Sequence, residues 1–360
     1  MARRKNNYIF APDHRRSRGP GCLVLTLALV LAVVVLSLLA NTSMNRSIKL
    51  ETAKVPVMSL DQAFENFTIL HISDLHGDAL GKDADAWRAL LYGKGFSAVV
   101  LTGDMVGKAG DVEPMLALIQ SIRQVNSTAP IYFVAGDDDP DPVTISYRGT
   151  PEVLAGWVKA AQEAGAVYLD APQSQQVGKR TVWFVPEYVY SMDPAGMAAS
   201  LTRQKEEMEG LGKQYEADGG ASYRALCYRL DTMNRCVEAI KAMTDKDLQI
   251  AVTHVPLEAD YIRTAVEWAN QTAVFNFRNV SLVMAGHYVA GQWRLPGVGP
   301  VYVPEEGWFP GDENLVGMQR INSINQYISG GLGASSFYPM PGRLLNSPSV
   351  ALLSLTAKIQ

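Results

Sequence analysis

The sequence predicts an α/β fold, and three observations carry that prediction. From Phe67 onward, short β-branched and aliphatic runs alternate with stretches of helical periodicity, which is typical of strands and helices that follow one another. The chain has 360 residues, of which 48% are hydrophobic, enough for a sizeable core and unlike a disordered chain. Three cysteines in this length exclude a small fold stapled by disulfides.

The N-terminal region predicts a membrane anchor. Residues 22–40 form an apolar run without a charge, close to the roughly 20 residues that span a bilayer. The segment before it, residues 1–21, is basic, and basic flanks stay on the cytoplasmic side. We therefore expect a cytoplasmic tail over 1–21, a transmembrane anchor over 22–40 and a C-terminal domain outside the cytoplasm, in a single-pass protein of the cell membrane. A cleaved signal peptide is the alternative, although its apolar region is usually shorter.

The part of the chain after the anchor divides into a linker and a domain. Residues 41–66 are polar and mixed and predict a linker, and residues 67–360 predict the domain. Residues 41–360 carry 26 basic and 35 acidic side chains. Because this excess of negative charge would repel a polyanion, we expect no nucleic-acid partner.

Five predicted strands share one feature, because each leads directly into an Asp or His residue. We expect these strands at residues 67–73, 98–102, 131–135, 248–253 and 281–285. The residues that follow them are, in the same order, Asp74 with His76, Asp104, Asp137, His254 and His287. Open α/β sheets build their sites beyond the carboxyl ends of their strands. The sequence therefore predicts that these side chains converge.

Helical segments separate the strands, and one of them is unusually long. Helices are expected at residues 83–92, 111–124, 151–164 and 259–270. Residues 194–246 contain no strand pattern and predict an inserted helical hairpin, with helices over 194–217 and 221–243. Two interpretations of this insertion stay open, a packing elaboration and a lid over the site. Cys227 and Cys236 would lie roughly 13 Å apart along the second helix, too far to bridge, which favours two free cysteines.

Convergent carboxylates and imidazoles predict a metal site. Ligands of these two types without thiolate suit Mn, Fe, Zn or Mg rather than a structural zinc finger. One bridging carboxylate with ligands on both sides would hold two divalent cations about 3.5–4 Å apart. Such a pair activates water and stabilises in-line displacement at phosphorus.

The order and spacing of these residues resemble the five sequence blocks of the calcineurin-like metallophosphoesterase superfamily. The blocks read Asp74-x-His76, Gly103-Asp104, Gly136-Asp137-Asp138-Asp139, His254 and Gly286-His287-x-Val289. The segments 286–296, 330–333 and 341–343 further resemble its membrane-anchored bacterial branch, the YkuE-like type. The resemblance implies a four-layer α-β-β-α sandwich of two mixed sheets, to which this chain adds the helical insertion and the transmembrane helix.

The resemblance also implies a role for each residue of the blocks. Asp74 and His76 would ligate the first metal and Asp104 would bridge the two. Asp137, His254 and His287 would ligate the second metal.

Two blocks depart from the family pattern. The third block of the family reads Gly-Asn-His-Asp/Glu, so that Asp137 replaces the Asn and Asp138 replaces the His. Asp138 is thus the candidate catalytic residue, although a carboxyl donates a proton to a leaving group only if its pKa is strongly raised. The fifth block ends in a second His, where this chain has Val289, and the first metal should bind more weakly. His71, the one spare imidazole after the tail, is expected to lie within a strand.

Two functions from different classes follow. The first is a membrane-anchored, exported phosphoesterase that hydrolyses a phosphate ester or pyrophosphate by metal-activated water, with a phosphorylated small molecule or an envelope or lipid-linked compound as substrate. The second is a degenerate member of the family that acts as an extracytoplasmic binding or scaffolding protein. Substitutions in the third and fifth blocks favour the second function, and the six retained ligands favour the first.

Overall fold

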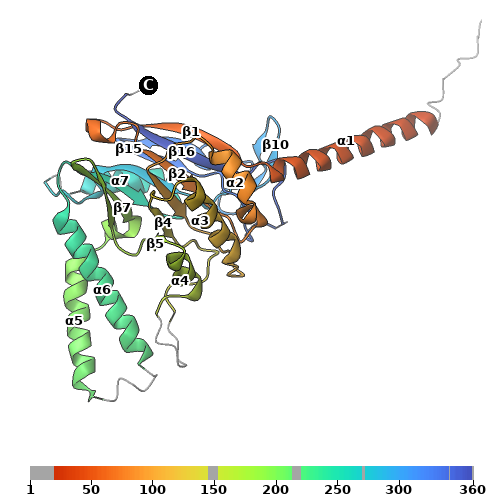
Figure 1. Ribbon diagram of the computed structural model, residues 1–360. Coiled ribbons are helices and arrows are strands. Elements are labelled where there is room, and N and C mark those ends of the chain that lie inside the picture. The colour runs from red at the N-terminus through yellow and green to blue at the C-terminus, as the bar shows by residue number, and fades with distance from the viewer. Residues whose placement is uncertain (1–19, 145–152, 213–219, 270–271, 340, 359–360) are drawn as a thin grey trace, which may run out of the picture. The chain divides into compact units, whose positions relative to one another are not determined.

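The computed structural model describes residues 20–144, 153–212, 220–269, 272–339 and 341–358 (Figure 1). The chain divides into two compact units, Met1–Ser43 and Met44–Gln360. The larger unit contains two six-stranded sheets with helices and two small hairpins. Most of the predicted tail, residues 1–19, lies outside the described residues.

The N-terminal helix agrees with the predicted apolar span. Helix α1 covers Pro20–Arg46. Its segment Leu23–Arg46 has a mean hydropathy of 3.1 and is long and apolar enough to cross a membrane. The large apolar side chains from Leu23 to Leu39 are exposed.

The first sheet is mixed and contains both the earliest and the latest strand of the domain. Its order is β1-β16-β2-β3-β4-β5. The strands are β1 (Lys49–Pro56), β16 (Ser349–Thr356), β2 (Thr68–Ile72), β3 (Ala98–Thr102), β4 (Ile131–Val134) and β5 (Ala166–Tyr168). Strands β2 to β5 are parallel to one another, β16 is antiparallel to β2, and β1 is parallel to β16.

The prediction of a linker over residues 41–66 was wrong. Residues 44–46 end helix α1, and eight of the following residues form β1, which pairs with β16 along its whole length. A short 3-10 helix, Gln62–Phe64, follows and buries Phe64. Lys49, Thr52 and Lys54 of β1 are exposed, whereas Val55 is buried and Glu51 accepts a hydrogen bond from Tyr327 of the second sheet. This half-polar pattern is typical of an edge strand.

The second sheet is also mixed, with the order β14-β15-β9-β8-β7-β6. Its strands are β14 (Gly317–Ile321), β15 (Ile324–Ile328), β9 (Val280–Ala285), β8 (Leu248–Val252), β7 (Arg180–Pro186) and β6 (Gln173–Val177). The four inner strands are parallel and the two edge strands run antiparallel to their neighbours. All five predicted strands are present at the centres of the two sheets.

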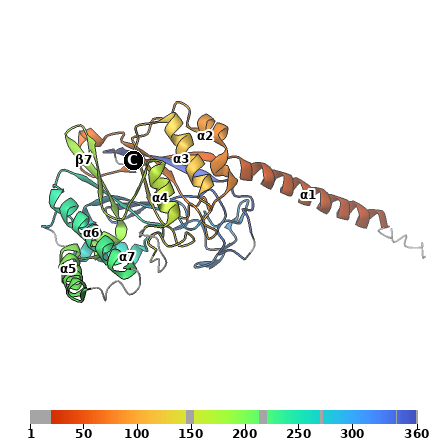
Figure 2. The same ribbon diagram turned by 60° about the horizontal axis from the view of Figure 1, so that its bottom comes forward.

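The two sheets pack face to face between two layers of helices, which confirms the predicted α-β-β-α sandwich. In β3, Val99 and Leu101 face one helical layer, whereas Ala98 and Val100 pack against the second sheet. The strand thus has no polar face, as its continuous apolar sequence indicates. The layer on the first sheet contains α2 (Ala84–Leu91), α3 (Glu113–Val125) and α4 (Gly156–Glu163). The layer on the second sheet contains α5 (Pro194–Gly210), α6 (Ala221–Ala242) and α7 (Ala259–Trp268) (Figures 1 and 2).

The inserted hairpin α5–α6 belongs to the outer helical layer of the second sheet. Its apolar residues pack on Trp183 and Val185 of β7. Arg235 of α6 also makes two bonds of 2.7 Å to the carboxylate of Asp170. The observed contacts thus agree with the packing interpretation of this segment. Cys227 and Cys236 both lie in α6 and are free.

Small elements between β9 and β14 have no counterpart in the predictions. Strands β10 (Arg294–Leu295) and β11 (Gly299–Pro300) form one hairpin, and β12 (Tyr302–Val303) and β13 (Gly307–Trp308) form another. Among the described residues, further 3-10 helices occupy Ala79–Lys82, Glu187–Ser191 and Phe277–Asn279.

Candidate metal centre

The two sheets bring their carboxyl-terminal edges to one place. The first sheet supplies Asp74 and His76 after β2, Asp104 after β3 and Asp137 after β4, and the second supplies His254 after β8 and His287 after β9. In the described residues these six side chains form two groups suited to a metal ion, and within each group the possible ligand atoms lie within 4.8 Å of one another. The predicted convergence of the six residues is confirmed.

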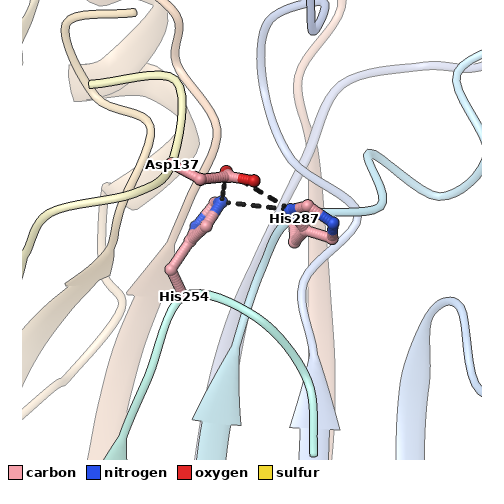
Figure 3. A group of neighbouring side chains, drawn as sticks. All are labelled: Asp137, His254 and His287. Carbon is pink, nitrogen blue, oxygen red and sulfur yellow. Dashed lines mark hydrogen bonds and ion pairs between the residues drawn. The ribbon is translucent and has the colours of Figure 1, made fainter. Parts of the chain in front are cut away.

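The group made of Asp137, His254 and His287 joins the two sheets (Figure 3). Nε2 of His254 lies 2.8 Å from Oδ1 of Asp137 and 3.3 Å from Nδ1 of His287. Nδ1 of His287 lies 3.4 Å from the same Asp137 oxygen. Three potential ligand atoms therefore point toward one another.

The group made of Asp74, His76 and Asp104 is more deeply buried. Oδ1 of Asp74 accepts a hydrogen bond from the backbone N–H of His287 at 2.9 Å. Its Oδ2 and the Nε2 of His76 are buried and have no hydrogen-bond partner. Buried polar atoms without partners are costly, so these two atoms fit a site that a cation completes.

Asp104 lies between the two groups. Its Oδ2 is 3.6 Å from Nε2 of His76 and 3.3 Å from Nε2 of His254. Its Oδ1 accepts a hydrogen bond from the backbone N–H of Asp138 at 2.8 Å. One carboxylate oxygen is thus fixed by the backbone while the other faces ligands of both groups, the position that a bridging carboxylate requires.

Each of the three histidines is oriented through its other ring nitrogen. Nδ1 of His254 donates to the carbonyl oxygen of Thr102 at 2.8 Å, which leaves Nε2 as the nitrogen that a metal could take. Nδ1 of His76 is 3.3 Å from Oδ2 of Asp138, and Nε2 of His287 is 3.1 Å from Oε1 of Glu305. Such partners fix the tautomer and raise the basicity of a metal-ligating imidazole. The role of Glu305 was missed, because it lies in a hairpin without a strand pattern.

The carboxylate of Asp138 contacts His76 on one side and Ser336 on the other. Ser336 donates to it twice, through Oγ at 2.9 Å and through its backbone N–H at 3.2 Å. The hydrogen bond from His76 is the main cause that lowers the pKa of Asp138, and the bonds from Ser336 add to it against the opposing effect of burial. This direction is opposite to the raised pKa that the predicted proton donor needs.

Asp139 fixes the loops that carry the ligands, a role that the sequence did not reveal. Its buried carboxylate accepts hydrogen bonds from the backbone N–H groups of Met105, Val106, Gly107 and Gly136. Burial raises the pKa of Asp139 despite these bonds. The loop after β3 and the loop after β4 are therefore tied together beneath Asp104.

The backbone of the site is held in left-handed conformations. Asp74, His76, Asp104 and His287 have φ values of 53°, 50°, 53° and 77°, which non-glycine residues adopt at a cost and mainly at functional sites. Gly103 has a φ of 89°, and a Cβ at this position would lie 2.7 Å from Nδ1 of His254. Only glycine allows β3 to approach the imidazole so closely.

The electrostatics of the site show an excess of negative charge. Burial alone would lower the pKa of His254, but hydrogen bonds to Asp104 and Asp137 outweigh it and hold the pKa well above its ordinary value. The pKa of His76 is raised in the same way, because Asp138 and Asp74 outweigh burial. Carboxylates that draw protons onto nearby imidazoles form a donor set for divalent cations. The residues present therefore fit the metal ions that the sequence predicts.

Two further positions were considered in the sequence. Val289 is buried with a φ of 51°, and its side chain has no atom that could ligate a metal. His71 lies within β2, as expected, where its Nε2 is 2.9 Å from Oγ1 of Thr102. It belongs to neither group of potential ligands in the described chain.

Comparisons with known proteins identify a family. Among solved structures, a phosphopantetheinyl hydrolase (PptH) from Mycobacterium tuberculosis aligns with a TM-score of 0.34 and 10% identity, covering 75% of this chain and 91% of its own. The protein TT1561 of Thermus thermophilus aligns with a TM-score of 0.35 and 14% identity, covering 74% and 89%. No curated protein matches the chain. The sequence model for calcineurin-like phosphoesterases matches residues 67–291. The match spans more than half of the chain and includes both groups of potential ligands, and the chain therefore belongs to the calcineurin-like phosphoesterase family.

Proposed function

We propose that this protein is a membrane-anchored, metal-dependent phosphoesterase whose catalytic domain lies outside the cytoplasm. The observation that carries the proposal is the pair of ligand groups that meet at Asp104. Families of this kind hydrolyse phosphoester bonds, and an arrangement of two groups around one carboxylate is what two cations require.

The residues of the site would divide between two divalent cations, Mn, Fe, Zn or Mg. Asp74 and His76 would hold the first, Asp137, His254 and His287 would hold the second, and Asp104 would serve both. When bound, such cations lower the pKa of water and neutralise charge on a phosphoryl group. Asp137, an oxygen ligand with a full negative charge, favours the harder cations among them.

The remaining residues act on the ligands rather than on the substrate. Asp138 fixes the ring of His76, Glu305 fixes the ring of His287, and Thr102 fixes His254. Asp138 occupies the position of the family's histidine, and we propose that it positions His76 instead of protonating the leaving group.

Helix α1 supports membrane anchoring, and the basic residues before it support a cytoplasmic N-terminus. A tethered enzyme meets substrates at the membrane surface, which favours a lipid-linked or envelope phosphate ester or pyrophosphate. These features are also those of the membrane-anchored bacterial branch, and we place the chain there as part of the proposal.

The test is hydrolysis of a chromogenic phosphodiester by the full chain in detergent, with and without added Mn. We expect turnover that depends on the metal, that a chelator removes, and that is lost in Asp104→Asn. Asp141→Asn is the matched control, because Asp141 is exposed and lies in the same acidic run outside both groups.

The degenerate alternative predicts a different outcome. A chain that only binds would retain metal without turning over the phosphodiester, and Asp104→Asn would then change the metal content alone. Equal turnover by the parent and Asp104→Asn would contradict the assignment of the site.

A further inference from the structure

The two hairpins between β9 and β14 present apolar side chains to solvent. Leu295 and Val298 in the first hairpin are 40% and 58% exposed, and Trp308 and Phe309 in the second are 69% and 59% exposed. Val301 joins the hairpins, because its N–H donates to Trp293 at 2.8 Å and its carbonyl accepts from Phe309 at 2.9 Å. The two hairpins are therefore hydrogen-bonded to one segment of backbone, and their four exposed apolar residues are named here the hairpin surface.

The first hairpin is linked by hydrogen bonds to the last turn of helix α1. The side-chain amide of Asn45 donates to the carbonyl of Arg343 at 3.0 Å. The next residue, Leu344, accepts a hydrogen bond from the backbone N–H of Arg294 in β10 at 2.9 Å. Two hydrogen bonds and one peptide link thus connect the base of the first hairpin to the end of the apolar helix.

Only a short connection separates helix α1 from the first strand of the domain. Helix α1 ends at Arg46 and β1 begins at Lys49. These two residues are three steps apart along the chain and span at most about 11 Å. If α1 crosses a bilayer, the loops bonded to Asn45 remain close to the lipid headgroups.

The composition of the hairpin surface fits a lipid interface. Tryptophan and other amphipathic aromatic rings are enriched where membranes meet water, and grouped exposed apolar side chains mark interaction surfaces. The same segment is acidic, with Glu306, Asp312 and Glu313 outside the apolar residues. Attraction to anionic lipid therefore does not hold the hairpin surface at the membrane. Its contact with lipid depends on the burial of its apolar side chains and on the connection to helix α1.

The hairpin surface is also linked to the metal centre. Glu305 lies in the turn between β12 and β13 and contacts His287 at 3.1 Å. Phe337, which is 50% exposed, lines a small pocket together with His287 and Glu305. If the hairpin surface lies at the lipid headgroups, this pocket lies beside the headgroups as well.

We propose that the hairpin surface rests in the interface of the membrane that holds α1 and presents the metal centre to phosphate groups of lipid or lipid-linked molecules. This inference rests on the membrane anchoring in the proposed function. The inference adds a second membrane contact, which the domain itself makes. It also favours phosphorylated compounds embedded in the membrane, rather than soluble ones, as substrates.

The experiment is tryptophan quenching of the full chain in phosphatidylcholine nanodiscs whose acyl chains carry bromine near the headgroup. The chain has six tryptophans and none of them lies in α1. Trp87, Trp157, Trp183 and Trp293 are buried, which leaves Trp308 and Trp268 as the exposed ones. Trp268→Phe is the matched control, because Trp268 is 83% exposed at the end of α7.

The expected result is quenching by brominated lipid in the parent and in Trp268→Phe, with most of the quenching lost in Trp308→Phe. It should persist in high salt, because the contact is apolar. Equal quenching of the parent and Trp308→Phe, or no quenching of a parent that co-elutes with the nanodiscs, would overturn the inference. Trp308 emission that changes with protein concentration in detergent but is not quenched by brominated lipid would indicate that a second copy of the protein covers the hairpin surface. This result would also overturn the inference. Co-elution of the protein with the nanodiscs tests membrane anchoring by α1 separately. The quenching measurement needs neither metal nor turnover. A failure of the phosphoesterase assignment would therefore appear in the hydrolysis assay and leave the quenching result unchanged.

Discussion

Nδ1 of His76 and Oδ2 of Asp138 lie 3.3 Å apart, and Ser336 holds the same carboxylate from the other side. Removal of the carboxylate in Asp138→Ala leaves the ring of His76 without its partner. We expect roughly 10–100-fold weaker binding of Mn at one of two sites, measured by calorimetric titration of the full chain in detergent. Asp141→Ala is the control. Unchanged Mn affinity with slower turnover would instead support a proton-donor role for Asp138.

Glu305 has the corresponding role at the other group of ligands. Its side chain is partly exposed, and its carboxylate contacts Nε2 of His287. Glu305→Gln keeps the shape of the side chain and removes its charge, so we expect weaker binding of the second cation, by about tenfold. The neighbouring change Glu306→Gln should leave Mn affinity unchanged. Equal effects of the two substitutions would mean that general charge, rather than the bond to His287, sets the affinity.

The close approach of Gly103 to His254 provides a steric test of the site. Gly103→Ala places a methyl group 2.7 Å from Nδ1 of His254, whereas Gly178→Ala, also at positive φ, meets nothing within 4 Å. Both substitutions should lose about 1 kcal/mol of stability from backbone strain. We expect only Gly103→Ala to abolish Mn binding, measured by the metal content after dialysis. Retention of the metal by this variant would show that His254 is not a ligand.

His71 predicts a pH dependence of stability. Complete burial lowers the pKa of this imidazole to about 3, against about 6.5 in an unfolded chain. Below pH 6.5 the unfolded state binds a proton that the native state does not, so stability falls as the pH decreases. The contribution is fully present above pH 6.5 and declines toward pH 3, by about 1.4 kcal/mol per pH unit.

The corresponding variant is His71→Gln, which keeps a polar atom for Thr102. Between pH 6.5 and pH 5.0 the parent should lose roughly 2 kcal/mol more than the variant. Denaturant unfolding of the full chain in detergent at the two pH values measures this difference, since the other titrating groups are common to both proteins. Parallel losses in the two proteins would show that His71 is already solvated in the native state.

The sequence predicted the central strands and the ligands because both depend on local signals. A strand such as residues 98–102 is apolar on both faces, and the Gly-Asp pair that follows it marks where the chain turns into the site. The arrangement in two sheets came from the family resemblance, and the order of the strands within each sheet was not predicted, since the pairing of distant strands has no local signal.

The predictions that failed or were missing depend on partners far away in the chain. Strand β1 looked like a linker because its partner β16 lies about 300 residues later. The hydrogen bonds from Ser336 to Asp138 were missing from the predictions because the two residues are 198 positions apart in the chain. Glu305 gave no signal, since a glutamate in a short hairpin is ordinary until the fold places it beside His287.

Because β16 lies between β1 and β2, the first sheet can form completely only after β16 has been synthesised. During synthesis β1 and β2 emerge about 280 to 300 residues before β16 (residues 349–356), and both must wait for it before their facing edges are paired. Open strand edges promote aggregation. The growing polypeptide therefore passes through a long vulnerable stage, and ribosome stalling or premature termination before β16 should yield a product that chaperones or proteases must remove.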